Sequence, residues 1–244
     1  QRASWEDSML HVQNMVLDNC LSTIKHETIY YPNKIKQIVG RLNTQNLSEE
    51  EERENVEAIS ELIEYYKGIF TILSSCAARQ LEEVTFRRST ISVADLCEYA
   101  VKYFRKASKG KTSRIEFLTE STEKRIIGDI NQLRFLLENL IDEALTVRED
   151  GILKLHAAED GNYIRFLFTD TRREKSVDEL NKLFYPNLAR MTSGEKGELR
   201  GTEYLICKQI IRDHDEFAGR RGCRINAEPA QEGGFTVYFT LPKR

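Results

Sequence analysis

The sequence has neither an excess of basic residues nor a long apolar run, and each absence excludes a class of protein. Lys and Arg number 36 against 39 Asp and Glu, so the net charge of −3 does not favour nucleic acid as a partner. No apolar stretch approaches the roughly 20 residues of a membrane helix, and the polar beginning does not resemble a signal peptide. We therefore expect a cytoplasmic protein that binds no nucleic acid.

Cysteine is also scarce. The sequence contains five cysteines, an odd number, and they form no CxxC pair and no Cys/His cluster at metal-ligand spacing. This pattern predicts reduced thiols in a cytosol-like compartment rather than a disulfide framework. The scattered positions are Cys20, Cys76, Cys97, Cys207 and Cys223.

Proline and glycine are almost absent from the first part of the chain. Residues 1–86 contain one proline, Pro32, and two glycines, Gly40 and Gly68. Apolar residues recur there at helical spacing, whereas from about residue 90 short β-rich runs alternate with helical patterns. The change predicts an α+β protein of two domains, with a helical hairpin over residues 1–87 and a mixed-sheet α/β sandwich over residues 88–244.

The second predicted helix begins with an N-terminal signal. Ser48 can cap it, Glu51 can complete a capping box, and the acidic run favours the positive helix end. A heptad seam then follows, made of Val56, Ile59, Ile63, Tyr66, Phe70, Leu73 and Ala77. The first helix, at about residues 5–43, supplies a partner for this seam. Because a hairpin with apolar outer seams generally doubles, we predict a homodimer with a four-helix bundle.

The rest of the chain alternates between strand and helix patterns. A strong helix is opened by Asp129 and is apolar on one face, and another helix runs from about Thr202 to His214. The long polar segment 171–200 predicts a lid or a mobile segment. The predicted strands are Ile115–Thr119, Ile152–Ala157, Tyr163–Thr169, Cys223–Ala227 and Phe235–Leu241.

His26 lies on the first predicted helix, in the string KHETIYYPNKI of residues 25–35. On a helical projection it faces away from the apolar stripe that contains Leu17 and Ile38. Glu27 beside it can orient the ring or take its proton, although an exposed histidine without a role is the simpler interpretation of this dipeptide alone. Pro32 removes a backbone hydrogen bond and should bend the helix, with or without consequence for function.

The order of these parts resembles the kinase core of two-component sensor histidine kinases. In that family a dimerisation and phosphoacceptor hairpin precedes an ATP-binding domain of the gyrase and Hsp90 type. The resemblance covers nearly the whole chain, and five strings of the second domain carry it in the family's order. They are GDINQLRFLLENLIDEAL (128–145, Asn box), IRFLFTDT (164–171, strand to the first Gly box), LNKLFYP (180–186, Phe box), GTEYLICKQIIRDH (201–214, second Gly box) and INAEPAQEGGFTVYFTLP (225–242, closing strands).

The resemblance implies ATP and Mg²⁺ as cofactors and assigns roles to particular residues. His26 would accept the phosphoryl group, with Glu27 as the assisting base. Asn139 and Glu143 would bind Mg²⁺ and nucleotide, and Asp170 would accept a hydrogen bond from the adenine amino group.

The same resemblance places two further nucleotide-binding candidates at the second Gly box. Gly201 precedes a helix whose backbone N–H groups should cradle phosphate, and Lys208 lies on that helix. In the preceding segment, Gly194 and Gly197 would leave the lid some mobility.

The sequence departs from the family pattern mainly in the nucleotide pocket. Glu143 stands where the second asparagine of the Asn box is usual, and Arg172 and Glu174 replace two glycines of the first Gly box. We expect Arg172 to fill space or to contact a phosphate. In the second Gly box, Glu203 and Tyr204 replace a glycine and a small apolar residue, and the acid opposes phosphate binding.

The phosphoacceptor segment departs less. Pro32 follows His26 by six residues where five is usual, and Tyr30 stands at a position that is often Thr or Asn and is linked to dephosphorylation. These differences bear on phosphatase activity toward a partner rather than on phosphoacceptor chemistry.

Two functions therefore stay open. In the first, the chain is the cytoplasmic core of a sensor-histidine-kinase-like protein, in which ATP-dependent autophosphorylation of His26 precedes phosphotransfer to a response regulator receiver domain. Any tether to the inner membrane would then lie in a sensor region outside this sequence. In the second, a pseudokinase or scaffold with a degenerate ATP site acts through dimerisation and partner binding. A chaperone or topoisomerase relative fits less well, because a hairpin with His26 and Glu27 precedes the ATP-binding domain.

Overall fold

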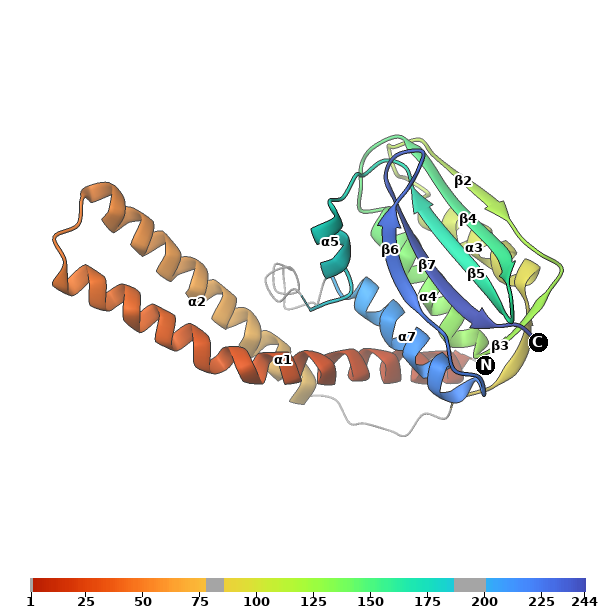
Figure 1. Cartoon of the computed structure of the whole chain (residues 1–244), viewed down its shortest axis with the longest axis horizontal. Helices are drawn as coiled ribbons and strands as arrows, with labels where there is room; N and C mark the ends of the chain where they lie inside the picture. The colour runs from red at the N-terminus through yellow and green to blue at the C-terminus, as the bar shows by residue number, and fades with distance from the viewer. Residues whose placement is uncertain (1, 78–85, 187–200) are drawn as a thin grey trace. The chain divides into compact units, whose positions relative to one another are not determined.

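The computed structural model describes residues 2–77, 86–186 and 201–244, apart from the side chains of residues 2–3, 23–29 and 67–77. These residues fall into two compact units (Figure 1). The sheet unit contains the described residues of Gln1–Gln13, Glu82–Tyr185 and Glu203–Arg244. The hairpin unit contains those of Asn14–Leu81 and Pro186–Thr202.

The hairpin unit is built on two long helices that the apolar spacing predicts. They are α1 (Arg2–Thr44), which enters the unit at Asn14 and continues through Pro32, and α2 (Glu49–Ala77). The capping box of α2 is confirmed, because the Ser48 N–H donates to Glu51 Oε2 at 2.8 Å and the Glu51 N–H donates to Ser48 Oγ at 3.3 Å. Across the described residues, no helix is long and apolar enough to cross a membrane.

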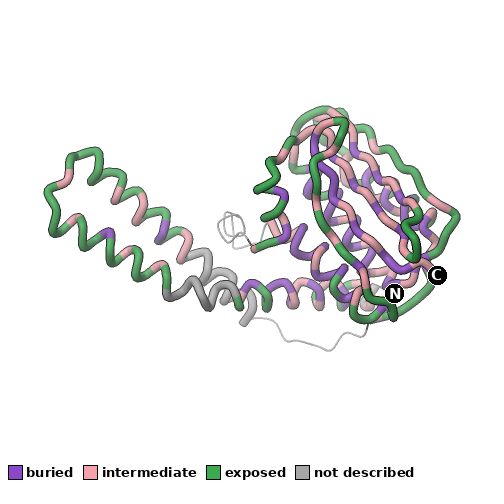
Figure 2. The backbone as a smooth tube through the Cα atoms, in the orientation of Figure 1, coloured by how far each residue is buried: buried purple, intermediate pink, exposed green. Residues whose placement is uncertain are grey.

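The two helices of the hairpin pack through residues beside the predicted heptad seam. Ile38 of α1 is 7% exposed and Leu62 of α2 is 9% exposed. Val56 and Ile63 of the seam are instead 54% and 44% exposed, and Figure 2 shows how much of this hairpin faces solvent. The expectation that α1 covers the seam is therefore wrong for these two residues, which point to a surface outside the hairpin.

The sheet unit contains a five-stranded mixed sheet, and all five strands were predicted from the sequence. The two strands at one edge, β2 and β4, run parallel, and the other neighbours are antiparallel. In spatial order the strands are β2 (Ile115–Glu120), β4 (Gly151–Asp160), β5 (Tyr163–Asp170), β7 (Phe235–Pro242) and β6 (Ile225–Pro229).

Three helices cover one face of this sheet (Figure 1): α3 (Val93–Ala107), α4 (Ile130–Ala144) and α7 (Glu203–Phe217). Alternate residues of β5 are buried, as expected for a strand with one covered face. Phe166 and Phe239 stack in this core with ring centroids 4.9 Å apart, and neither is exposed. The short helix α5 (Val177–Lys182) follows β5 and also begins in a capping box.

Four elements are absent from the sequence-based prediction, namely α3, the strands β1 (Ser89–Ser92) and β3 (Arg125–Gly128), and α5, which lies within the segment predicted as a lid or mobile segment. β1 and β3 pair with each other as a separate antiparallel ribbon, and four residues are too few to display an alternating pattern. Helix α3 does carry a signal, because its Ser92 cap accepts the Asp95 N–H at 3.2 Å. Its buried stripe is Val93, Leu96, Cys97, Ala100 and Phe104.

The beginning of α1 packs within the sheet unit. Trp5 meets Phe135 of α4 edge to face, with ring centroids 6.2 Å apart. Asn131, in the first turn of α4, donates from its side-chain amide to Ser4 Oγ at 3.3 Å. The first turns of α1 thus add a helical piece against α4.

Candidate active site

Helix α4 carries two of the predicted site residues on one face. Its N-cap Asp129 accepts hydrogen bonds from two backbone N–H groups of the first turn, at 2.9 and 3.3 Å, which fixes the start of the helix. Asn139 and Glu143 follow four residues apart and are 7% and 2% exposed. The Asn139 amide donates to the carbonyl of Phe135 at 2.8 Å, so this side chain is bonded to its own helix.

Asp170 ends strand β5, and its carboxylate is bound by Arg172. The Arg172 Nε and backbone N donate to Oδ1 at 2.8 and 3.0 Å, and Nη2 donates to Oδ2 at 2.8 Å. The two side chains are 3% and 1% exposed. This is a buried, bidentate ion pair of the strongest geometric type.

The Arg172 guanidinium also binds the chain that follows α4. Its Nη2 donates to the carbonyl of Ala144 at 2.6 Å, and Nη1 lies 3.4 and 3.3 Å from the carbonyls of Val147 and Glu149. A guanidinium has five N–H groups, and together with the bonds to Asp170 each has an acceptor here. Arg172 therefore joins the end of β5 to the C-terminal end of α4.

Two glycines make room for this arrangement. A Cβ at Gly151 would overlap with the aliphatic stem of Arg172, and a Cβ at Gly234 would overlap with the backbone carbonyl of Asp170. Gly234 also has a left-handed φ of +75°. Only residues without a side chain allow both close approaches.

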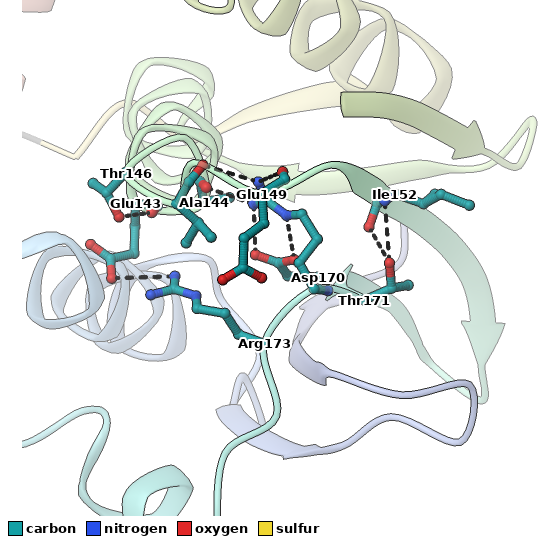
Figure 3. A network of polar contacts seen from close by, with 10 residues as sticks. Glu143, Ala144, Thr146, Glu149, Ile152, Asp170, Thr171 and Arg173 are labelled. Atoms are coloured by element: carbon teal, nitrogen blue, oxygen red, sulfur yellow. Dashed lines mark hydrogen bonds and ion pairs between the residues drawn. The ribbon is translucent and has the colours of Figure 1, made fainter. Parts of the chain in front are cut away.

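The next arginine along the turn reaches the other acidic residue of the pocket. Arg173 Nη2 lies 3.8 Å from Glu143 Oε1, and the two side chains are 26% and 3% exposed. Figure 3 shows this pair beside the network around Asp170. One short turn after β5 thus directs a cation to Asp170 and a second cation to Glu143.

Helix α7 presents further candidates. Lys208 donates to the carbonyl of Phe184 at 3.3 Å and lies over the ring of Tyr185 at 4.6 Å, and burial lowers its pKa. The structure therefore directs Lys208 to the predicted Phe box rather than to Asp170. Gly201, in the short stretch before α7, has a left-handed φ of +72°.

Two acids influence a buried thiol on α7. Burial raises the pKa of Cys207 well above its ordinary range, and the charges of Glu203 and Glu143 raise it further. These acids occupy the replaced positions of the second Gly box and the Asn box. In the described part of the chain, no group of three or more His, Cys, Asp or Glu side chains could hold a metal ion.

Residues 128–244 match the sequence profile of a family described as histidine kinase-, DNA gyrase B- and HSP90-like ATPase. These residues belong to that family. We call residues 128–244 the ATPase domain, and it contains Asn139, Glu143, Asp170, Arg172 and Arg173.

Curated relatives of the chain are sensor kinases. It is 26% identical over 164 residues to the signal transduction histidine-protein kinase BaeS of Escherichia coli K12, covering 65% of this chain and 33% of BaeS. It is 25% identical over 127 residues to the sensor histidine kinase RcsC of the same organism, covering 51% of this chain and 13% of RcsC. The chain thus spans a third or less of these relatives.

Solved structures of histidine kinases share the fold. The nucleotide-free catalytic domain of ThkA aligns with 64% of this chain and 96% of its own length, at a TM-score of 0.51 and 19% identity. ThkA in complex with the response regulator protein TrrA aligns with 98% of this chain and 65% of its own length, at a TM-score of 0.52 and 17% identity. With the sequence matches, these likenesses support a divergent two-component histidine kinase core.

The residues of the ATPase domain, as arranged here, do not fit ATP with Mg²⁺. Arg172 saturates the Asp170 carboxylate, Arg173 pairs with Glu143, and the Asn139 amide is bonded within α4. The sequence-based prediction assigned Asn139, Glu143 and Asp170 to one site, but it did not foresee that neighbouring arginines bind the two acids.

The predicted phosphoacceptor pair lies within helix α1. The side chains of His26 and Glu27 are outside the described residues, as are Gly194 and Gly197 of the predicted lid. Tyr30, one turn after the histidine, is 56% exposed.

A buried histidine, not predicted as part of the site, supports the start of α4. The His214 Nδ1–H donates to the carbonyl of Ile210 at 2.7 Å, so Nε2 is left to accept the backbone N–H of Asp129 at 3.1 Å. Complete burial lowers the pKa of His214 to about 4. Phe86 packs edge to face on the imidazole at 4.9 Å. The ATPase domain thus fixes its Asn-box helix through a neutral imidazole.

Proposed function

We propose that this chain is the signalling core of a histidine-kinase-like protein in which His26 accepts a phosphoryl group. An aspartate of a response regulator receiver domain would then receive it, and Glu27 would act as the base beside His26. The order of parts carries this proposal: a helix with His26, a second helix, then the ATPase domain. The structure of ThkA in complex with the response regulator protein TrrA aligns with 98% of this chain, and this likeness of fold supports the proposal.

The proposal includes a homodimer built on residues 1–87, with residues 88–244 as the nucleotide-binding type of domain. Val39, Val56 and Ile63 expose 41%, 54% and 44% of their surface on the hairpin. A second copy that presents the same residues would cover them in a four-helix bundle, which is the usual way in which a hairpin with an apolar outer seam becomes stable.

Labelling experiments test the role of His26. Wild type, His26→Ala and His11→Ala would each be incubated with radiolabelled ATP and Mg²⁺, and separately with a phosphorylated receiver domain. From the phosphorylated receiver domain we expect an acid-labile, base-stable label in wild type and in His11→Ala, and none in His26→Ala. His11 is the matched control because it also lies on α1. Equal labelling of all three proteins would show that His26 is not the acceptor.

The ion pair of Arg172 with Asp170 favours a second function, that of a pseudokinase or scaffold that acts through dimerisation and partner binding. The two donors separate the alternatives. Label from the receiver domain but not from ATP would indicate a phosphohistidine carrier without kinase activity. Label from neither donor, with the dimer intact, would indicate a scaffold.

A further inference from the structure

We propose that Arg172 is an internal occupant of the adenine position of the ATPase domain. Its guanidinium takes the hydrogen-bond acceptors that an adenine base would need, so this form of the protein excludes adenine nucleotide. The inference rests on the proposed function only in taking Asp170 as the acceptor for the adenine amino group. It requires nothing of His26.

The bonding at Asp170 gives Arg172 an advantage over a base. A buried carboxylate must receive hydrogen bonds or a counter-charge, because an unpaired buried charge is very unfavourable. The Arg172 side chain supplies two N–H donors at 2.8 Å and a full positive charge, and its backbone N–H adds a third bond at 3.0 Å. An adenine amino group has two N–H donors and no charge, so it compensates the same carboxylate less completely.

Displacement of Arg172 would also leave other acceptors without donors. The carbonyls of Ala144, Val147 and Glu149 all accept from its Nη atoms. The first of these ends α4, where the negative end of the helix dipole favours a cation. A ligand that removed the guanidinium would have to satisfy these carbonyls as well as Asp170, and each one left unpaired opposes binding.

The neighbouring residue, Arg173, places a cation where the family resemblance expects a metal ion. Arg173 lies 3.8 Å from Glu143, the residue that the family resemblance assigns to Mg²⁺. A cation near this buried acid reduces the attraction that a metal ion would feel. Because both arginines lie on one turn, ligand binding at either acid requires the turn to rearrange.

Isothermal titration of the full chain with ADP and Mg²⁺ tests the proposal. The proteins would be wild type, Arg172→Ala, Arg172→Gln and the control Arg221→Ala, which removes an exposed ion pair with Asp215. We expect Arg172→Ala and Arg172→Gln to bind ADP at least about tenfold more tightly than wild type, as expected when a site that is mostly occupied becomes free. The Arg221→Ala variant should match wild type.

Two further titrations identify the position that is freed. GDP lacks the amino group at the same place on the ring and should show no gain with either Arg172 variant. Asp170→Asn in the Arg172→Gln background should lose the gain for ADP, because it removes the charged acceptor. Circular dichroism and thermal melting establish which variants are folded, and the glutamine variant is used where the alanine variant is not.

The proposal is overturned if wild type binds ADP as tightly as the folded variants. It is equally overturned if a folded Arg172 variant binds no more ADP than wild type, since another feature then excludes the nucleotide. Neither result depends on phosphorylation. A failure of His26 to accept phosphate would contradict the proposed function and leave the ADP affinities as the measure of this inference.

Discussion

The hairpin and the ATPase domain differ in their unusual side chains: the hairpin exposes apolar residues, whereas the ATPase domain buries acids. The hairpin presents apolar residues such as Val56 and Ile63 to solvent, although a covered position would favour them. The ATPase domain buries acids that a nucleotide or metal would normally meet, and it binds them with its own arginines. The hairpin leaves apolar surface uncovered, whereas the ATPase domain pairs its two acids within the same chain.

A hairpin whose apolar seam is open keeps the capacity to assemble, which both proposed functions require. The ATPase pocket pairs its acids Asp170 and Glu143 with arginines of its own chain, and a buried charge with a partner is far less unfavourable than an unpaired one.

The largest expected effect comes from breaking the internal ion pair. Arg172→Ala leaves the Asp170 carboxylate buried without its charge partner, and we expect the ATPase domain to lose about 3–5 kcal/mol of stability. The measurement is the thermal transition of this domain in the full chain, followed by near-ultraviolet circular dichroism. Replacing both residues, as in Asp170→Leu with Arg172→Met, should recover much of the loss, because no buried charge remains.

The exposed pair of Arg221 with Asp215 provides the contrast for that experiment. Its arginine is 74% exposed, so Arg221→Ala should cost less than about 1 kcal/mol. A similar loss for Arg172→Ala and Arg221→Ala would mean that burial gives the Arg172 pair no special weight. The stability of the ATPase domain would then not depend on the buried pair of Arg172 with Asp170.

A second prediction concerns pH. His214 is buried and neutral, with a pKa of about 4 against an ordinary 6.5. Below pH 6.5 the unfolded chain binds a proton that the folded chain does not, so stability falls between about pH 6.5 and pH 4 and is fully present above that range. The shift corresponds to about 3 kcal/mol across the window. Denaturant unfolding at pH 4–7 measures it.

His214→Gln should remove this dependence at the expense of some stability at neutral pH. His156→Gln is the control, because the His156 side chain is 41% exposed and lies on the open side of the sheet beside Glu120. If the slope of stability with pH is the same in wild type and His214→Gln, another group is responsible for it. The buried hydrogen bond between His214 and the Asp129 N–H would then not account for the loss of stability at low pH.

Most of the fold was predictable because burial leaves a periodic pattern. Helix α4 buries an apolar face behind a clear cap at Asp129, and the central strands β4 and β5 bury alternate residues. The ribbon of β1 and β3 was not predictable, since each strand has only four residues. Helix α3 was predictable from its cap at Ser92 and was overlooked.

The sequence indicated which residues to assign to the candidate site, but not which hydrogen bonds and ion pairs they form. Spacing grouped Asn139 and Glu143 on one helical face, and the family resemblance added Asp170. The sequence also showed an arginine where a glycine was usual. It could not show that Arg172 turns back to the carboxylate two residues before it, because that depends on the space left by Gly151 and on the three carbonyls after α4. The contacts with these carbonyls join residues 23 to 28 positions apart in the sequence.

A third prediction concerns the exposed apolar seam of the hairpin. Ile63→Glu introduces a charge into the exposed seam of α2, and we expect the dimer dissociation constant to rise about 10- to 100-fold. The control is Arg53→Glu, which adds an acid at an exposed position outside the seam. Multi-angle light scattering over a range of concentrations measures both. A wild-type protein that is monomeric at micromolar concentration, or equal affinities for the two variants, would contradict assembly through this seam.

The smallest effect compares one motif in both regions. Ser48 with Glu51 in the hairpin and Ser176 with Glu179 in the ATPase domain form the same capping box. In each box the pKa of the glutamate is lowered first by the backbone N–H of the serine and then by its hydroxyl. Ser48→Ala and Ser176→Ala remove only the hydroxyl, so each pKa should rise part of the way to its ordinary value in a carboxyl-detected NMR titration. Equal rises would show that local capping is the same in both regions, and that their difference lies in what each region buries. Unequal rises would mean that the capping hydrogen bonds at the two helix starts also differ in strength.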